Sequence, residues 1–393
     1  MFKTRVLTNF NQSEFEKMLN RMGVEPVGTN IMAPKSEYRL VYAQDLDPRA
    51  ANIVKQEFLS AGGEAAVSWE ALNLSEDQSR IIMMGTLAHY DRVCRKLKMQ
   101  PFDLDELAKE IQRSINYYDE PRELPWHPEN CQVMGILNVT PHSFYDGGEF
   151  NAVDKAVERA VEMEKKGADI IDIGGESTRP GSERISLEEE KERVLPVIEK
   201  VSKKTDSLIS IDTYKPEIAE AAVDVGVDIV NDIFGLRKEG MAEKVAELDV
   251  PVIIMHMQGT PRNMQKNPQY DDVINDISKF FLERVEYAKN AGISEENIIL
   301  DSGIGFGKNL EHNLEIIRRL DEFNSLGHPM LLGASRKSFL KGVLDKKVDE
   351  RLYGSLAVAA HAVEKDVAIL RVHDVEETVD VVKTIEAVKS AKG

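Results

Sequence analysis

The sequence predicts an α/β protein in which a small α+β domain precedes a (β/α)8 barrel. From residue 131 onward, eight short runs rich in Ile, Val and Leu recur, and a helical pattern follows each run. The runs do not alternate between apolar and polar residues, which is typical of strands buried on both faces. A doubly wound open sheet is the alternative, because the sequence does not show closure. The count of eight favours the barrel.

The predicted strands share this composition. They are CQVMGILN (131–138), DIIDI (169–173), SLISID (207–212), VDIVND (227–232), PVIIMHM (251–257), NIILD (297–301), PMLLGA (329–334) and VAILRV (367–372). Helix signals lie between them. Asn151 is expected to cap the first helix, and Gly167 is expected to end it. The second helix begins with the capping box SLEE (186–189), and Pro216 suits the first turn of the third.

Residues 1–125 form the predicted accessory domain and linker, and residues 126–393 the catalytic barrel. The first part shows mixed short patterns, including SEYRLVYAQ (36–44) and a helical stretch over 48–60. Pro121, Pro125 and Pro128 punctuate the linker before the first barrel strand. No chemical motif stands out there, so we expect an accessory packing or oligomerisation module.

Composition limits the classes of function. The chain has 393 residues, 42% of them hydrophobic, and a net charge of −18, which argues against binding to nucleic acid or to an anionic membrane. Cys94 and Cys131 make no disulfide framework, and no stretch approaches the ~20 apolar residues of a membrane span. We therefore expect a soluble cytoplasmic protein.

Polar residues follow every predicted barrel strand, at the end where ligands bind in parallel α/β folds. A lone Asp after a strand often only caps the next helix. Polar ends on all eight strands at once are better explained by a pocket. Its expected charges are the carboxylates Asp212, Asp232 and Asp301 and the cations Arg179, Arg336, Lys337 and Arg371.

The residue types at these ends indicate the kind of ligand. Arg371 and His373 lie two apart on an extended segment, so both face the same way and suit a phosphate or pyrophosphate. Asn138 is a neutral oxygen ligand suited to Mg²⁺ that also binds phosphate. Asp212 and Asp301 suit a heterocycle rich in N–H groups, because carboxylates accept hydrogen bonds. The glycine-rich stretches 147–148 and 174–181 suit mobile loops, or else ordinary tight turns.

Eight consecutive motifs resemble those of the dihydropteroate synthases, a family of pterin-binding barrel enzymes. They are MGILNVTPHSFYDGG (134–148), GADIIDIGGESTRPGS (167–182), SIDTYKPEIAEAA (210–222), VDIVNDIFGL (227–236), IIMHMQGTPRNMQ (253–265), LDSGIGFGKNLEHN (300–313), GASRKSF (333–339) and RVHDVEET (371–378). The resemblance covers residues 131–390. It implies a TIM barrel, commonly a homodimer, that uses Mg²⁺ to join 6-hydroxymethyl-7,8-dihydropterin pyrophosphate to p-aminobenzoate in folate biosynthesis. Sulfonamides compete for the p-aminobenzoate site of this family.

The resemblance also assigns roles to matching positions. It implies that the pterin ring is held by Asp212, Asn231, Asp301 and Lys337. It implies pyrophosphate binding by Arg371, His373 and Asn138, with Asn138 also ligating Mg²⁺. The p-aminobenzoate site is assigned to Thr178, Arg179, Pro180, Arg336 and Ser338. Asp146 helps to close the site, and the expected catalytic residues are Asp212, Asp301, Lys337 and Asp146.

Two motifs depart from the family pattern. The first loop usually reads TPDSFSDGG, and His142 and Tyr145 stand here in place of Asp and Ser. The sixth strand usually continues DPGFGFGK, and Ser302 and Ile304 replace Pro and Phe. These changes bear on the ordering of loop one and on packing at the pterin edge. Residues 1–125 lie outside the usual compact enzyme and resemble an extension of some bacterial and archaeal members.

The expected reaction is SN1-like, because a neutral arylamine is a weak nucleophile and the carbon–oxygen bond then breaks ahead of attack.

Two other functions would use the same pterin-binding carboxylates. A methyltetrahydrofolate:corrinoid methyltransferase has the same barrel, but it does not need the Ser-Arg-Lys-Ser and Arg-x-His anion sites. A non-catalytic pterin-binding paralogue is the other alternative, and a turnover assay distinguishes it.

Overall fold

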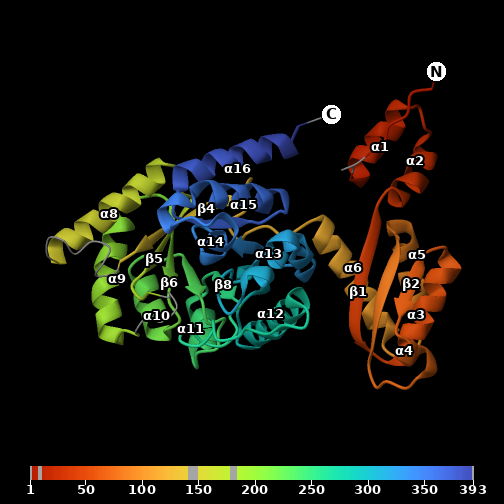
Figure 1. The fold of residues 1–393 in the computed structure, drawn as a ribbon, viewed down its shortest axis with the longest axis horizontal. Coiled ribbons are helices and arrows are strands. Elements are labelled where there is room, and N and C mark those ends of the chain that lie inside the picture. The colour runs from red at the N-terminus through yellow and green to blue at the C-terminus, as the bar shows by residue number, and fades with distance from the viewer. Residues whose placement is uncertain (1, 8–10, 140–148, 178–183, 392–393) are drawn as a thin grey trace. The chain divides into compact units, whose positions relative to one another are not determined.

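The computed structural model describes residues 2–7, 11–139, 149–177 and 184–391. The chain divides into two compact units, Met1–Asn116 and Tyr117–Gly393 (Figure 1). Each unit is described by itself. In the described residues, no helix combines the length and the apolar composition needed to cross a bilayer.

The first unit is an α+β domain, as the sequence predicts. Its three strands form an antiparallel sheet in the order β1-β3-β2. Helix α3 packs on β2 and β3, and Val54 and Phe58 of this helix are fully buried with Ile81 and Met83 of the sheet. The elements are α1 (Gln12–Arg21), α2 (Pro26–Met32), β1 (Tyr38–Leu46), α3 (Pro48–Ala61), β2 (Glu64–Val67), α4 (Trp69–Asn73), β3 (Ser79–Thr86), α5 (Leu87–Leu97) and α6 (Leu104–Asp119).

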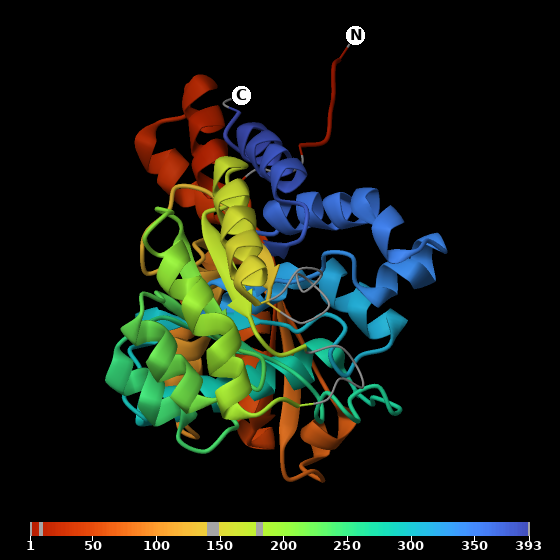
Figure 2. The same ribbon diagram turned by 90° about the vertical axis from the view of Figure 1, so that its left-hand side faces the viewer.

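The second unit is a closed barrel of eight parallel strands with helices outside it (Figures 1 and 2). The predicted (β/α)8 barrel is thus confirmed, and the open sheet is excluded because β10 pairs with both β9 and β11 and closes the ring. Its elements are β4 (Gln132–Asn138), α8 (Glu149–Lys165), β5 (Ile170–Gly174), α9 (Leu187–Val201), β6 (Leu208–Asp212), α10 (Pro216–Asp224), β7 (Ile229–Asp232), α11 (Met241–Leu248), β8 (Val252–Met255), α12 (Val273–Asn290), β9 (Ile298–Asp301), α13 (Leu310–Arg318), β10 (Met330–Leu332), α14 (Ser338–Leu344), α15 (Leu352–Glu364), β11 (Ile369–Val372) and α16 (Val375–Lys389).

Local signals set the helix ends. Gly167 follows α8 with a φ of +92°, a left-handed conformation that glycine adopts at little cost. Ser186 caps α9, since its hydroxyl accepts a hydrogen bond from the backbone N–H of Glu189 at 3.1 Å. Pro216 occupies the first turn of α10, where no helical partner for its missing N–H is needed.

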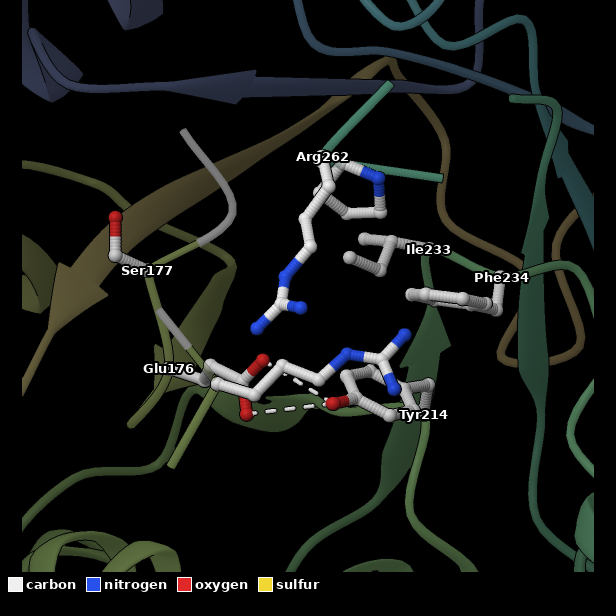
Figure 3. Close-up of a pocket in the computed structure, with 8 residues that line it drawn as sticks. Glu176, Ser177, Tyr214, Ile233, Phe234 and Arg262 are labelled. Carbon is white, nitrogen blue, oxygen red and sulfur yellow. Dashed lines mark hydrogen bonds between the residues drawn. The ribbon is translucent and has the colours of Figure 1, made fainter. Parts of the chain in front are cut away.

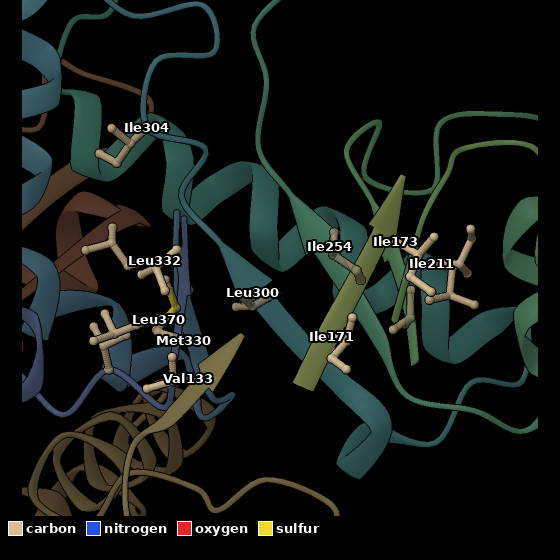
Figure 4. Packing of buried hydrophobic residues seen from close by; sticks show 14 of the residues in the cluster. Val133, Ile171, Ile173, Ile211, Ile254, Leu300, Ile304, Met330, Leu332 and Leu370 are labelled. Atoms are coloured by element: carbon tan, nitrogen blue, oxygen red, sulfur yellow. The ribbon is translucent and has the colours of Figure 1, made fainter. Parts of the chain in front are cut away.

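The outward side chains of the strands make the main core. Ile171, Ile173, Ile211 and Ile254 are fully buried against the surrounding helices (Figure 4). Burial of one such side chain stabilises a fold by about 1.5–3 kcal/mol. This shell therefore supplies most of the apolar burial that keeps the barrel closed.

A second apolar layer lies inside the barrel, at the amino-terminal half of the strands. It consists of Met134, Ile170, Ile229, Ile253, Ile299, Leu331 and Ile369, together with Leu124 from the segment before β4. Leu124 is only 2% exposed. Part of the predicted linker thus packs into the amino-terminal end of the barrel, because burial of the Leu124 side chain there removes apolar surface from water.

Candidate active site

Along each of several barrel strands, the side chains that point inward change from apolar to polar between one inward residue and the next. Successive inward residues are two apart. Two residues after Ile170, Ile229, Ile299 and Ile369 come Asp172, Asn231, Asp301 and Arg371. Asp212 is the next inward residue beyond Ser210 on β6 and pairs in register with Asn231. These five residues form a polar layer at the carboxyl ends of the strands.

Arg371 is the centre of the polar layer. Its guanidinium lies 2.6 Å from the carboxylate of Asp172 and 2.8 Å from that of Asp212. Asn231 donates from Nδ2 to both carboxylate oxygens of Asp172 at 3.4 Å. Burial disfavours the charge on Arg371, but the two carboxylates outweigh burial and raise its pKa above the usual value. Four of the strands, β5, β6, β7 and β11, are therefore joined by one charged network.

Asp172 is a site residue that the sequence reasoning missed. It is fully buried and bonds directly to Arg371. The predicted site residues lie at the ends of the strands or after them, whereas Asp172 lies within the run DIIDI. An acidic residue in the middle of an otherwise apolar strand was the available signal, because a buried carboxylate needs a partner.

The two predicted pterin-binding carboxylates both have raised pKa values. Burial is the largest cause for Asp212, and although Arg371 opposes it and Asp172 reinforces it, the pKa reaches about 7. Burial also raises the pKa of Asp301, while Lys337 lowers it. Oδ1 of Asp301 accepts a hydrogen bond from the backbone N–H of Gly303 at 2.8 Å, which orients the carboxylate. Both groups are buried, and neither is ionised as easily as a surface carboxylate.

Lys337 joins this layer from the loop after β10. It precedes α14 and donates a hydrogen bond to the backbone carbonyl of Ile304. Its Nζ lies 4.4 Å from the centroid of the Phe306 ring. Burial lowers the pKa of Lys337 to about 8, although Asp301 attracts the charge. The predicted grouping of Lys337 with Asp212, Asn231 and Asp301 is thus present in the structure.

The residues predicted for anions and Mg²⁺ lie at neighbouring strand ends. His373 follows β11, and its Nδ1 is 3.1 Å from Oγ of Ser335. Asn138 is the last residue of β4, pairs in register with Gly174 and is exposed. Among the described residues, no group of three or more His, Cys, Asp or Glu side chains is placed to hold a metal. The Asn138 side chain offers one neutral oxygen, the kind of ligand that Mg²⁺ accepts when water and phosphate supply its other ligands.

Two residues predicted for p-aminobenzoate lie beside Lys337. The guanidinium of Arg336 pairs with both carboxylate oxygens of Asp374, and the backbone N–H of Arg336 donates to Oγ of Ser355 at 3.0 Å. Arg336 therefore has partners on other segments, after β11 and on α15. Ser338 is the exposed first residue of α14. Thr178, Arg179, Pro180, Asp146, His142 and Tyr145 lie outside the described residues.

Asp232 is not a pocket carboxylate, and the expectation that it faces the cations is wrong. It is fully buried, and its two oxygens accept from the backbone N–H groups of Phe234 at 2.7 Å and Leu236 at 2.8 Å. The reason is the strand repeat. Asp232 is two residues from Val230, which packs in the outer core, so it follows the outward side of β7.

The two departures in the loop after β9 are both buried. Ser302 is fully buried, and its hydroxyl finds no hydrogen-bond partner among the described residues. The Ile304 side chain is fully buried in the outer core, while its carbonyl accepts from Lys337. Ile304 thus contributes a backbone group to the site and its side chain to the fold.

A pocket at the mouth carries further cations that the sequence reasoning did not single out. Its lining residues are Glu176, Ser177, Arg184, Tyr214, Ile233, Phe234, Pro261 and Arg262 (Figure 3). Glu176 accepts from the Tyr214 hydroxyl at 3.1 Å and from Nζ of Lys215 at 2.9 Å. Arg262 extends toward Glu176 in Figure 3. Arg184 and Arg262 thus add two cations to the polar groups at this end of the strands.

This combination of a parallel barrel with buried carboxylates, a lysine and an arginine at its mouth defines a class of enzyme. Residues 134–373 match the family model for pterin binding enzymes, and the chain belongs to this family. Dihydropteroate synthase of Escherichia coli is 48% identical over 266 residues, which cover 68% of this chain and 93% of that protein. A probable bifunctional folylpolyglutamate synthase/dihydropteroate synthase of Halobacterium salinarum is 41% identical over 397 residues. That match covers 99% of this chain, which spans 48% of the length of that relative.

Solved structures agree with this assignment. Xanthomonas albilineans dihydropteroate synthase with 4-aminobenzoic acid superposes with a TM-score of 0.64 at 41% identity, covering 67% of this chain and 95% of that one. The same enzyme in complex with 7,8-dihydropteroate gives a TM-score of 0.62 at 38% identity over the same shares of the two chains.

Proposed function

We propose that the barrel is a dihydropteroate synthase. It condenses 6-hydroxymethyl-7,8-dihydropterin pyrophosphate with p-aminobenzoate and releases pyrophosphate. The observation that carries this proposal is the polar layer. Buried Asp212, Asn231 and Asp301 and the adjacent Lys337 offer acceptors and a cation to a heterocycle, and Arg371 offers a cation to an anion beside it.

The pterin ring lies on the polar layer in this proposal. Its N–H groups donate to Asp212 and Asp301, and the amide of Asn231 matches both a donor and an acceptor on the ring edge. Lys337 supplies a donor to a ring nitrogen or carbonyl. Because these groups are buried and held by neighbours, their positions are set before the substrate arrives, which favours electrostatic stabilisation of the transition state.

The pyrophosphate lies toward β11 and β4. Arg371, His373 and Asn138 surround that side of the mouth, and the guanidinium of Arg371 is kept charged by its raised pKa. Asn138 would hold Mg²⁺, and the bound ion supplies positive charge to the pyrophosphate oxygens. Arg371 in addition keeps one contact with Asp212, so the anion side and the pterin side share a residue.

The reaction exchanges one bond to the pterin methylene for another. The carbon–oxygen bond breaks, and its electron pair leaves with the pyrophosphate. Positive charge then develops on the methylene and the ring, and the carboxylates of Asp212 and Asp301 stabilise it. The amine nitrogen of p-aminobenzoate attacks the methylene and releases its proton. Exclusion of water protects the cation, a role that we assign to the loops that carry Asp146 and Thr178–Pro180.

The p-aminobenzoate site is the part of the proposal that depends most on those loops. Ser338 and Lys337 border it from the start of α14, and Thr178, Arg179 and Pro180 complete it. Arg336 supports it through the backbone, because its side chain pairs with Asp374. We further propose that sulfonamides compete at this site, that the enzyme is a homodimer, and that it works in the cytoplasm, where the free thiols of Cys94 and Cys131 stay reduced.

The test is the formation of dihydropteroate and pyrophosphate by the purified protein. Both substrates are supplied, with and without Mg²⁺, and both products are quantified. We expect equimolar products that require both substrates and the metal. Pterin binding without pyrophosphate release would contradict the proposal and indicate a non-catalytic paralogue. Methyl transfer from methyltetrahydrofolate to a corrinoid would indicate the other barrel enzyme.

A further inference from the structure

Lys308 is a buried lysine that the proposed reaction does not use. It is 2% exposed and lies at the end of the loop that follows β9. Its Nζ is 2.9 Å from Nδ1 of His256, 3.0 Å from the carbonyl of Phe306 and 3.1 Å from the carbonyl of Gly303. The His256 carbonyl is a fourth acceptor at 3.5 Å, so acceptors surround the Lys308 amine.

His256 lies directly beneath the same loop, after β8. It is 6% exposed, and its backbone N–H donates to the carbonyl of Asp301 at 2.8 Å. Burial is the main reason that its pKa falls well below the usual value, so the ring is neutral and Nδ1 can accept from Lys308. Gly303 has a φ of +65°, and a Cβ there would lie 2.0 Å from the His256 carbonyl oxygen. The loop thus rests on the His256 backbone.

The loop carries three of the contacts that place the pterin-binding residues. Gly303 donates its N–H to Asp301, Ile304 accepts from Lys337, and the Phe306 ring packs against the Lys337 ammonium. Lys308 binds the carbonyls of Gly303 and Phe306, on either side of Ile304. Displacement of this segment therefore moves the partners of Asp301 and Lys337 together.

We propose that Lys308 and His256 are positioning residues for the reaction proposed above. Together they hold residues 303–306 from the outward side of β8 so that Asp301 and Lys337 meet the pterin in fixed places. This inference rests on the proposed function. It adds to that function a pair of residues that touch neither substrate and act only through the loop.

Several charged groups face Lys308. Burial is the main cause that lowers the pKa of Lys308 well below the usual value, and Lys337 lowers it further, whereas Asp301 raises it. Arg237 and Lys308 both disfavour protonation of His256, and Lys308 does the same to His312 on α13. The rings of Phe280 and Tyr270 close the other sides of His256 at centroid distances of 4.9 and 6.0 Å. Both members of the pair are therefore buried and flanked by packed rings.

The test compares two substitutions at one position in the full-length enzyme. His256→Asn keeps an acceptor near the place of Nδ1, whereas His256→Leu has a similar size and none. We expect His256→Leu to lower kcat/KM for the pterin substrate by about tenfold or more, because a small displacement of catalytic groups has effects of this order. We expect His256→Asn to stay within about threefold of the wild type. KM for p-aminobenzoate should change little in both.

Lys308→Met removes the other half of the pair and is expected to lower kcat/KM for the pterin substrate by about thirtyfold or more. Tyr270→Phe is the matched control, since Tyr270 donates to Gly307 of the same loop at 2.8 Å but not to residues 303–306. It should retain activity. Where Lys308→Met does not fold, the comparison of His256→Asn with His256→Leu decides alone. Equal losses in those two variants, or an unchanged kcat/KM in Lys308→Met, would overturn the proposal.

Calorimetric binding of the pterin alone separates this proposal from the proposed function. A wild-type protein that binds pterin without turnover would contradict the synthase function. The positioning role would still be tested by weaker pterin binding in His256→Leu than in His256→Asn. Equal pterin affinity in those two variants would overturn the positioning role.

Discussion

The inside of the barrel has two layers of opposite character on the same strands. The apolar layer contains Ile299 and Ile369, and the polar layer contains Asp301 and Arg371, only two residues further on. The apolar layer is buried and the polar layer mostly so, yet the first removes hydrocarbon from water and the second removes charge. The first stabilises the fold, whereas the second costs free energy unless each charge is paired. The two-residue repeat of the strands therefore places the apolar side chains that stabilise the barrel and the polar side chains of the site on the same inward face.

This contrast explains why the polar layer is so fully bonded. Arg371 has two carboxylate partners, Asp301 has the Gly303 N–H and Lys337 has the Ile304 carbonyl. Removal of one partner leaves a buried charge without compensation. Substitutions in the two layers should thus differ in kind as well as in size, and the following predictions test that difference.

The largest effect is expected for Lys337→Ala. Loss of the ammonium should lower turnover by about a hundredfold or more, which corresponds to about 3 kcal/mol of transition-state stabilisation. The fold should survive, because the residue lies in a loop at the mouth. Lys341→Ala, at an exposed lysine on the adjacent helix α14, is the control. Steady-state kinetics would refute the assigned role if Lys337→Ala remained nearly as active as the wild type.

Leu124→Ala tests the apolar layer. The cavity left by a buried Leu costs about 2–5 kcal/mol of unfolding free energy. Turnover below the melting temperature should stay within about threefold of wild type, since Leu124 lies at the other end of the strands from the polar layer. Denaturant titration measures the first effect and kinetics the second. An unchanged stability would show that this part of the linker does not support the barrel.

The pH dependence sharpens the view of the polar layer. Below the Asp212 pKa of about 7 the carboxyl is protonated and no longer stabilises a cation, and above the Lys337 pKa of about 8 the ammonium is lost. The profile of kcat/KM should therefore rise with pH to about 7 and fall above about 8. Asp172→Asn removes a negative charge that raises the Asp212 pKa, so the acid limb should move to lower pH. A limb that stays in place would exclude Asp212 as its origin.

The smallest effect is expected from removal of the first unit. Every residue assigned to the site lies in Tyr117–Gly393, and a chain of residues 117–393 keeps Leu124 in its place. Its kcat/KM should stay within about threefold of the full-length enzyme. Soluble monodisperse protein is required for the comparison. A folded 117–393 chain that binds pterin but forms no dihydropteroate would show that the first unit completes the active site.

Most of the barrel followed from the sequence because its strands are buried on both faces and lack alternation. The gathering of Asp212, Asn231 and Arg371 at one end of the barrel followed too, since parallel strands bring those ends to one mouth. Their roles in binding stay predictions. Asp172 was missed because it lies inside a strand, and Asp232 was misplaced because the strand repeat turns it outward. In both cases, counting residues in steps of two along the strand would have shown whether the side chain points into the barrel or out of it.

Other parts depend on contacts that no local pattern reveals. Leu124 lies among prolines and is predicted to be part of a linker, yet its side chain packs into the amino-terminal end of the barrel. Arg336 reads as a free cation, but Asp374, which follows a different strand, pairs with it. Lys308 belongs to a loop motif, and only the folded chain places it against His256.

The division into two layers can be tested most directly on one strand. Ile299→Ala and Asp301→Asn change residues two apart on β9, and both unfolding free energy and kcat/KM are measured for each. We predict that Ile299→Ala loses about 3 kcal/mol of stability and keeps kcat/KM within about threefold, because it leaves only a cavity. We predict that Asp301→Asn keeps its stability within about 1 kcal/mol and loses about a hundredfold or more in kcat/KM, because it removes a charge facing the pterin. An Asp301→Asn enzyme with wild-type turnover, or an Ile299→Ala enzyme that is stable but inactive, would contradict the account.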